Sequence, residues 1–151
     1  MAGLDALMRR LEKIGAAVVE ATKLPQRVAD ISAANVNKEL QRQFAQGVDP
    51  YGARYAPITD TTRRLRRGSK TAPPLTDLGH LRAGTVALVK PGARKLVLYF
   101  GEPYGIYHQR GTSRMPRRAI FPDRGIPERW RTAIKDAWLQ GAKNVFAQAF
   151  K

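Results

Sequence analysis

Apolar residues recur at helical spacing in two stretches near the start of the chain. Over residues 3–23, leucine, isoleucine and valine return every three to four positions, which predicts an amphipathic helix. A second stripe follows Pro25 and comprises Val28, Ile31, Val36, Leu40 and Phe44. Gly47 comes shortly after this stripe, and glycine commonly ends a helix, so the second helix should end there.

The middle of the chain contains two runs rich in β-branched, aliphatic and aromatic residues. Residues Thr85–Lys90 and Lys95–Phe100 flank the short connection Pro91–Arg94, whose proline and glycine are typical of a chain reversal. This pattern predicts an antiparallel hairpin that ends at Gly101. Residues 119–121, Ala-Ile-Phe, are a candidate third strand.

Short helical turns are predicted on both sides of the hairpin. Upstream, Leu75, Leu78 and Leu81 are spaced so that all three point inward from one turn. Downstream, residues 104–109 are expected to form a second turn.

The last helix should begin at Pro127 and Glu128, because proline suits a first helical turn and an acid suits its positive end. Its apolar stripe comprises Trp130, Ile134, Ala137, Trp138, Gly141, Val145 and Ala149. The two tryptophans on this stripe predict deep burial, mainly within the chain's own core. Together these elements predict one α+β domain over residues 1–151, with N-terminal helices, a small central antiparallel sheet containing the hairpin, and a long C-terminal helix.

The periodicity disappears between about residues 48 and 76. Asp49-Pro-Tyr-Gly52 predicts a tight turn, and a basic run then precedes Pro73-Pro74. The cations of this run are Arg63, Arg64, Arg66, Arg67 and Lys70. A loop of this length is either disordered or functional, and like charges should keep it extended until an anion neutralises them. Two interpretations remain open, a solvated flexible tip or a segment that contacts phosphates or an acidic partner.

The charge of the chain bears on its partners rather than on its fold. The 151 residues include 27 Lys and Arg against 12 Asp and Glu, which gives a formal net charge of +15. This excess either serves solubility or indicates residence beside nucleic acid or an acidic protein surface. The absence of cysteine excludes structural disulfides and thiolate metal sites. No apolar run approaches the ~20 residues of a membrane span, so we expect no membrane partner.

The residue types present do not favour catalysis or metal binding. His80 and His108 are far apart in sequence, and neither Ser69 nor Ser113 lies in the pattern of a nucleophile elbow. The acids are scattered without the spacing of a cation-binding loop. We therefore expect no enzyme activity, no cofactor, no metal and no small-molecule substrate, and we interpret His108 as structural rather than as a general base.

Residues 104–122 concentrate aromatic and basic side chains and contain no acid. Aromatic side chains favour burial, whereas arginines need polar or anionic partners. The segment therefore predicts a surface that meets an anionic or closely packed partner.

The order of these motifs resembles one protein family. The motifs are, in order, Asp49-Pro-Tyr-Gly52, Tyr55-Ala-Pro57, Leu75–Leu81, Tyr104–Gly111 and Met115–Pro122. Over residues 35–125 this arrangement is similar to the phage virion morphogenesis family, the tail-completion or neck proteins of Mu-like tailed phages.

The resemblance implies a structural virion protein, assembled in the host cytoplasm as a homo-oligomeric ring, a hexamer or a dodecamer. Such a ring would sit at the head–tail junction or the proximal tail end, contact neighbouring connector and tail proteins, and let DNA pass through its lumen. The residues expected at subunit or ring interfaces are Tyr104, Tyr107, His108, Gln109, Arg110, Arg114, Met115, Arg117 and Arg118. Among them, Arg117 and Arg118 should face acidic side chains or DNA. The alternative is a small basic nucleic-acid-binding protein whose loop at residues 63–70 contacts phosphates without reading sequence.

Overall fold

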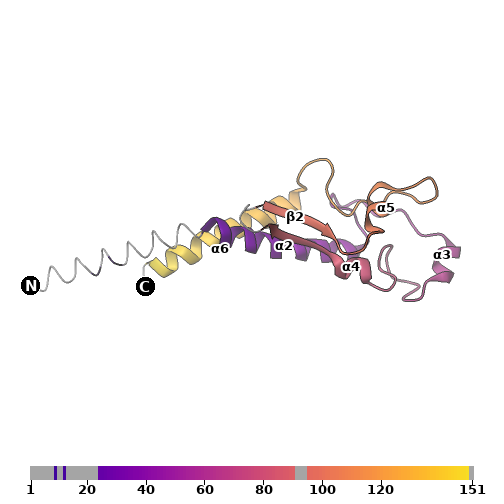
Figure 1. The fold of residues 1–151 in the computed structure, drawn as a ribbon, viewed down its shortest axis with the longest axis horizontal. Helices are drawn as coiled ribbons and strands as arrows, with labels where there is room; N and C mark the ends of the chain where they lie inside the picture. The colour runs from indigo at the N-terminus through magenta and orange to yellow at the C-terminus, as the bar shows by residue number, and fades with distance from the viewer. Residues whose placement is uncertain (1–8, 10–11, 13–23, 91–94, 150–151) are drawn as a thin grey trace, which may run out of the picture.

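The computed structural model of the chain describes residues 9, 12, 24–90 and 95–149. The predicted helix over residues 3–23 lies outside this description, apart from Arg9 and Glu12. The elements are, in chain order, α2 (Leu24–Gln46), α3 (Asp60–Leu65), α4 (His80–Gly84), β1 (Thr85–Lys90), β2 (Lys95–Phe100), α5 (Gly105–Arg110) and α6 (Glu128–Ala149). Helices α2 and α6 run side by side in opposite directions, and the hairpin of β1 and β2 lies along α2 (Figure 1). The predicted α+β class, with its hairpin and long C-terminal helix, is confirmed.

Helix α2 supplies the apolar stripe on which the other elements pack. The predicted stripe is buried at Val28, Val36, Leu40 and Phe44 and half-buried at Ile31. The prediction that this helix ends at Gly47 is also confirmed, since Gly47 has a φ of +66°. A Cβ at this position would come within 3.0 Å of Pro73 Cβ, so both the conformation and the space favour glycine.

The hairpin packs one face against the core and leaves the other face exposed. The strands pair antiparallel, as predicted for a hairpin, with Leu88 opposite Val97. On the inner face, Leu96, Leu98 and Phe100 pack against the core. On the outer face, Leu88 and Val97 are 53% and 42% exposed. The sheet therefore contributes to the core from one side only.

The side chain of Asn37 on α2 takes the place of a neighbouring strand beside β1. Its Nδ2 donates to Ala87 O at 3.0 Å, and its Oδ1 accepts from Ala87 N at 2.6 Å. Because both backbone groups of Ala87 point away from β2, α2 satisfies the outer edge of β1 at its centre. Strand β2 has no further strand beside it within the described part of the chain.

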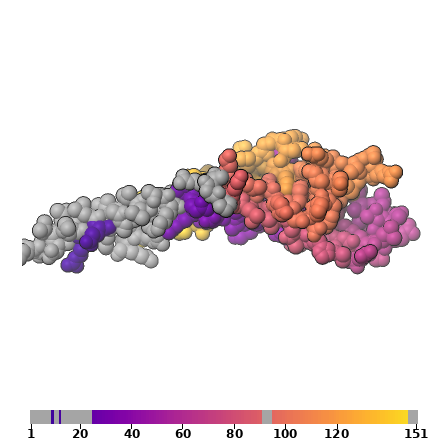
Figure 2. Space-filling model, in the orientation of Figure 1, coloured from indigo at the N-terminus to yellow at the C-terminus, as the bar shows by residue number. Residues whose placement is uncertain are grey.

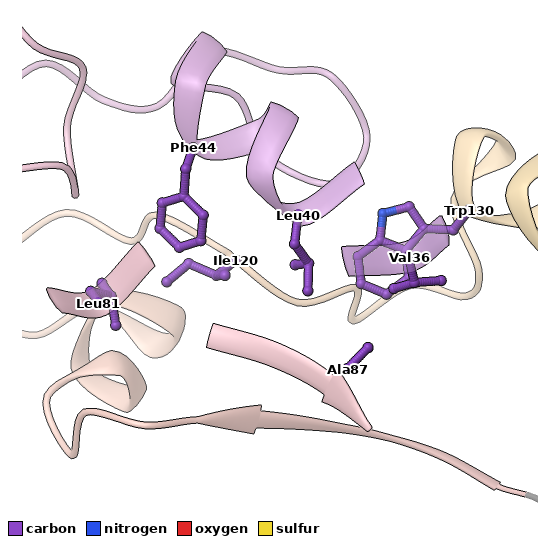
Figure 3. Packing of buried hydrophobic residues seen from close by; sticks show 7 residues of the cluster. All are labelled: Val36, Leu40, Phe44, Leu81, Ala87, Ile120 and Trp130. Atoms are coloured by element: carbon purple, nitrogen blue, oxygen red, sulfur yellow. The ribbon is translucent and has the colours of Figure 1, made fainter. Parts of the chain in front are cut away.

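Seven buried side chains form the centre of the core (Figure 3): Val36, Leu40, Phe44, Leu81, Ala87, Ile120 and Trp130. A polar side chain, Gln43, is fully enclosed beside them. Its Oε1 accepts from Trp130 Nε1 at 3.0 Å, and its Nε2 donates to Ile120 O at 3.1 Å. Both ends of the buried amide are thus hydrogen-bonded, as a polar group in an apolar core requires.

Two local predictions are wrong because side chains or helical geometry override the pattern. Residues 119–121 form no strand, and the described residues contain a two-stranded sheet. Trp138 is 49% exposed, although Trp130 on the same predicted stripe is buried. Successive residues lie about 100° apart around a helix, so burial of Ala137 against α2 turns Trp138 toward the side of the interface.

The predicted turn at residues 75–81 is also displaced. Leu75 and Gly79 have φ angles of +71° and +83°, which are left-handed, so the segment cannot be one continuous helical turn. The helix begins only at His80, with Leu81 buried and Leu78 54% exposed. The predicted turn at residues 104–109 is confirmed as α5.

Two leucines provide a matched test of this core. Replacing fully buried Leu40 by alanine should lower the free energy of unfolding by about 2–5 kcal/mol, because it removes apolar contacts and leaves a cavity. The same change at Leu65, which is 76% exposed on α3, should alter it by less than about 0.5 kcal/mol. Urea unfolding followed by circular dichroism measures both, and equal losses would contradict the assigned core.

Candidate functional site

A cleft of about 470 Å³ lies where α4, α5 and three irregular segments meet. The irregular segments are residues 57–59, 75–79 and 114–118, and Thr62 of α3 completes one side. These elements gather at the end of the molecule opposite the C-terminus (Figure 1). Five of the predicted interface residues line this cleft: Tyr104, His108, Arg114, Met115 and Arg118. We call it the basic cleft, because two buried arginines border it.

A tight reversal after α5 brings residues 114–118 back to the cleft. Gly111 has a φ of +75°, and a Cβ there would lie 3.0 Å from Arg117 N, so the reversal favours glycine. Thr112 pairs with Met115 in an isolated bridge. Arg118 N then donates to His108 O at 2.8 Å, which ties the returning chain to α5.

Gln109 holds the next residues in place from inside the fold. Its Oε1 accepts from Ile120 N at 2.8 Å and from Phe121 N at 2.9 Å, while its Nε2 donates to Phe121 O at 2.9 Å. These bonds replace the ladder that a third strand would need, which explains why residues 119–121 are not a strand. Gln109, predicted at an interface, therefore has an internal role in the structure.

Arg118 is buried and binds backbone carbonyls, although the sequence predicted that it faces a partner. It is 6% exposed, and it donates from Nε to Ala56 O at 2.8 Å and from Nη2 to Pro57 O at 2.9 Å. Burial, and next the nearby charge of Arg66, lower the pKa of Arg118. The guanidinium thus anchors the chain before α3 and borders the cleft at the same time.

Arg66 is likewise buried, lines the cleft and binds backbone carbonyls. It is 9% exposed and donates from Nη1 to Ser69 O at 3.1 Å and Ala72 O at 2.6 Å. Its Nη2 donates to Pro73 O at 2.9 Å. The prediction of an extended basic run is therefore wrong over this stretch, because Arg66 folds the loop around itself and α3 precedes it.

The other cations of that loop remain on the surface. Arg63, Arg64, Arg67 and Lys70 are exposed. Arg63 and Lys70 line a second hollow of about 480 Å³ together with Arg54. Lys70 Nζ also donates to Arg64 O at 3.2 Å. The side chains of these four residues are therefore accessible, and their contact with phosphates or an acidic partner stays a prediction.

No carboxylate neutralises the two buried arginines within the described residues. The ion pairs found there involve Arg42, Arg117, Arg124 and Arg131, not Arg66 or Arg118. Asp77 lines the cleft, but its Oδ1 accepts from Gly68 N at 2.8 Å and its Oδ2 from Arg67 N at 3.4 Å. Three arginines, Arg66, Arg114 and Arg118, thus line the cleft against this one carboxylate, so the cleft keeps a net positive charge although neither buried arginine forms an ion pair.

His108 lies on α5, close enough to Arg118 to feel its charge. Its Nδ1 is buried and has no hydrogen-bond partner in the described part of the chain. Burial first, and then the charge of Arg118, lower its pKa. Its ring meets that of Tyr104 edge-on, with the centroids 6.2 Å apart. The neutral, packed ring agrees with the structural interpretation of this residue.

The remaining predicted interface residues do not line the cleft. Tyr107 and Arg110 are exposed on α5. Arg117 donates from Nε to Gln109 O at 3.0 Å, and its Nη2 forms a hydrogen-bonded ion pair with Asp123. The hydrogen bond from Arg117 to Asp123 is the main cause that lowers the pKa of Asp123.

Of the described residues, no cluster of three His, Asp or Glu side chains is placed to hold a metal ion. None of the described helices combines the length and apolar character needed to cross a membrane.

Sequence reasoning missed the apolar walls of the cleft and the burial of both arginines. The sequence signal lies in the proline dipeptides Ala56-Pro57 and Ala72-Pro73. Extended chain next to proline leaves carbonyls without strand or helix partners, and one guanidinium can donate hydrogen bonds to several of them at once.

Comparison of the chain with protein-family models, with curated proteins and with solved structures finds no match.

Lowering the pH should destabilise the fold through His108. The folded protein binds a proton on this ring less readily than the unfolded chain, whose histidine has a pKa near 6.5. The contribution to stability is therefore complete above about pH 6.5 and is lost as the pH falls below it. Thermal unfolding between pH 7.5 and 5.5 should show this loss, and His108→Gln should reduce the pH dependence. The exposed His80→Gln serves as control, and an equal effect of both changes would contradict the assignment.

The buried arginine of the loop should matter far more for stability than its exposed neighbour. Arg66→Ala leaves three carbonyls without their donor and should cost about 3 kcal/mol of unfolding free energy. Arg64→Ala, on the exposed side of α3, should cost less than about 0.5 kcal/mol. Denaturant unfolding of both variants tests this, and a neutral Arg66→Ala would show that the loop does not depend on the guanidinium.

Proposed function

We propose that this protein is a structural subunit of a tailed-phage virion. In this role it is a neck or tail-completion component that forms a ring at the head–tail junction or proximal tail end, around the path of the DNA. The observation that carries the proposal is that two separate apolar surfaces stay exposed on different elements of one small chain. The order of sequence motifs, which resembles the virion morphogenesis family, supports the same role.

The first surface is the outer face of the hairpin, and atoms of the hairpin are exposed on the face of the molecule drawn in Figure 2. It joins two cross-strand pairs, Val86 with Tyr99 and Leu88 with Val97. Tyr99 is 57% exposed. A two-stranded sheet is marginal in water, and contiguous apolar side chains on its open face favour a covering partner. The unpaired outer edge of β2 lies beside this face and offers backbone groups to the same partner.

The second surface is a stripe on α6. Trp138, Leu139 and Phe146 are 49%, 52% and 62% exposed. Leu139 and Phe146 are seven positions, about two helical turns, apart, so they lie near one line along the helix, with Trp138 to one side of it. A ring requires two different patches on each subunit, so that one copy's first patch meets the next copy's second patch. The hairpin face and the α6 stripe supply such a pair.

The net charge sets the conditions under which copies can associate. At +15, subunits repel one another at low ionic strength, and salt screens this repulsion. Self-assembly should therefore increase with salt concentration. The exposed residues of α5 and its N-cap, Tyr104, Tyr107 and Arg110, remain for contact with a neighbouring connector or tail protein.

The second candidate function is non-specific binding of nucleic acid. The exposed cations at residues 63, 64, 67 and 70 favour it, because they cluster around one short helix. This function has the opposite salt dependence. If about six cations met phosphates, the logarithm of affinity would fall with the logarithm of salt concentration at a slope of about −5.

Paired charge substitutions test the ring. Tyr99→Glu blocks the hairpin face and Trp138→Glu blocks the α6 stripe, so each variant alone should lose higher-order assembly. Mixed together, they should form a heterodimer and go no further, because one intact patch of each variant can still meet. Light scattering after size exclusion, over a range of salt concentrations, measures these states.

Leu65→Glu, on exposed α3, is the control and should assemble as the wild type does. A wild-type chain that stays monomeric at every salt concentration would refute the proposal. Monomers whose binding to DNA weakens steeply with salt would favour the second candidate.

A further inference from the structure

We propose that the basic cleft binds an acidic segment of a different protein, with a carboxylate held between Arg66 and Arg118 and an apolar neighbour against the cleft wall. This inference does not depend on ring assembly. Every residue that it uses lines the cleft, which is at the end of the molecule where α4 and α5 lie.

The two arginines have donors left over after they bind the loop carbonyls. A guanidinium has five N–H groups, of which Arg118 uses two on carbonyls and Arg66 uses three. Both side chains are buried and border one cleft, and neither forms an ion pair with a carboxylate of the described residues, Asp77 in the same cleft included. The two guanidinium groups repel each other, and neutral carbonyls cannot cancel that repulsion. Binding of an anion between them is therefore favourable. Burial first, and then the charge of Arg66, lower the pKa of Arg118, so the two like charges do influence each other.

The walls of the cleft select the kind of anion. Ile58, Leu75, Leu81 and Met115 line it beside the arginines. An acidic peptide can place a carboxylate on the guanidinium groups and an apolar side chain on these walls. The sugar-phosphate backbone of a nucleic acid has no aliphatic side chain to fill the same space. The mixed lining therefore favours protein over nucleic acid.

The acidic segment must come from another protein. The twelve acids of this chain are dispersed, and two of those nearest to each other, Asp123 and Glu128, are five positions apart. Both already pair with arginines, Asp123 with Arg117 and Glu128 with Arg131. A second copy of this chain thus offers no acidic run for the cleft.

The test uses the full-length chain and a short fluorescent peptide of alternating Glu and Leu, with the Gln–Leu peptide as its uncharged match. Fluorescence anisotropy should show that the Glu peptide binds about tenfold more tightly than the Gln peptide. The uncharged Gln side chains cannot form charge-assisted hydrogen bonds with the arginines. Equal binding of the two peptides would overturn the proposal.

Three arginine variants locate the binding. Arg114→Gln at the exposed rim should weaken binding of the Glu peptide severalfold without affecting the fold, and Arg118→Gln should weaken it about tenfold. Arg110→Gln, exposed on α5 outside the cleft, is the matched control and should bind as the wild type does. Equal weakening by Arg110→Gln and Arg114→Gln would show general charge attraction and overturn the proposal.

Two further measurements distinguish peptide binding in the cleft from ring assembly and from nucleic-acid binding. Tyr99→Glu, which blocks assembly through the hairpin, should leave peptide binding unchanged, so failure of the ring and failure of the cleft are distinguishable. A single-stranded oligonucleotide that binds more tightly than the Glu peptide, and that loses binding with Arg114→Gln and Arg118→Gln, would overturn the proposal and assign the cleft to nucleic acid.

Discussion

The buried amide of Gln43 joins three parts of the chain that are distant in sequence. Through it, α2 binds the indole of Trp130 on α6 and the backbone of Ile120 in the segment before α6. Without this side chain, a buried N–H and a buried C=O would each lack a partner, a cost of about 1–3 kcal/mol per group. The segment that it fixes also carries Met115 and Arg118. The position of the basic cleft therefore depends on a hydrogen bond in the core.

A single helix stripe serves as the packing surface for everything else, and this limits how much apolar surface the fold can cover. The buried stripe of α2 belongs to one cluster with Trp130 of α6 and Ala87 of the hairpin, and α2 contacts both elements. Once both are in place, the outer hairpin face and the Trp138 side of α6 have no element of the described chain left to pack against. A domain of this size has a limited core, so unused apolar surface is available for contact with neighbours.

Elements with a clear period were predictable, whereas contacts made by single side chains were not. The stripe of α2, the start of α6 and the two strands of the hairpin follow from the sequence pattern alone. Residues 119–121 have the composition of a strand, but Gln109 occupies their backbone groups from α5, a contact that no periodicity reveals. Trp138 shows the converse limit, because an apolar stripe can be wider than the interface that it faces.

The cleft was only half predictable for a related physical reason. The sequence shows arginines gathered near residues 63–70 and 110–118, but charged side chains normally face solvent, so the burial of Arg66 and Arg118 had no direct signal. Their burial follows from proline-rich chain on both sides of α3, whose carbonyls need donors that no neighbouring strand provides. One guanidinium binds the carbonyls at each proline dipeptide, and as a result two positive charges border the same cleft. An anion that binds there would relieve their repulsion in the folded state alone, so its binding energy would add directly to the stability of the loop.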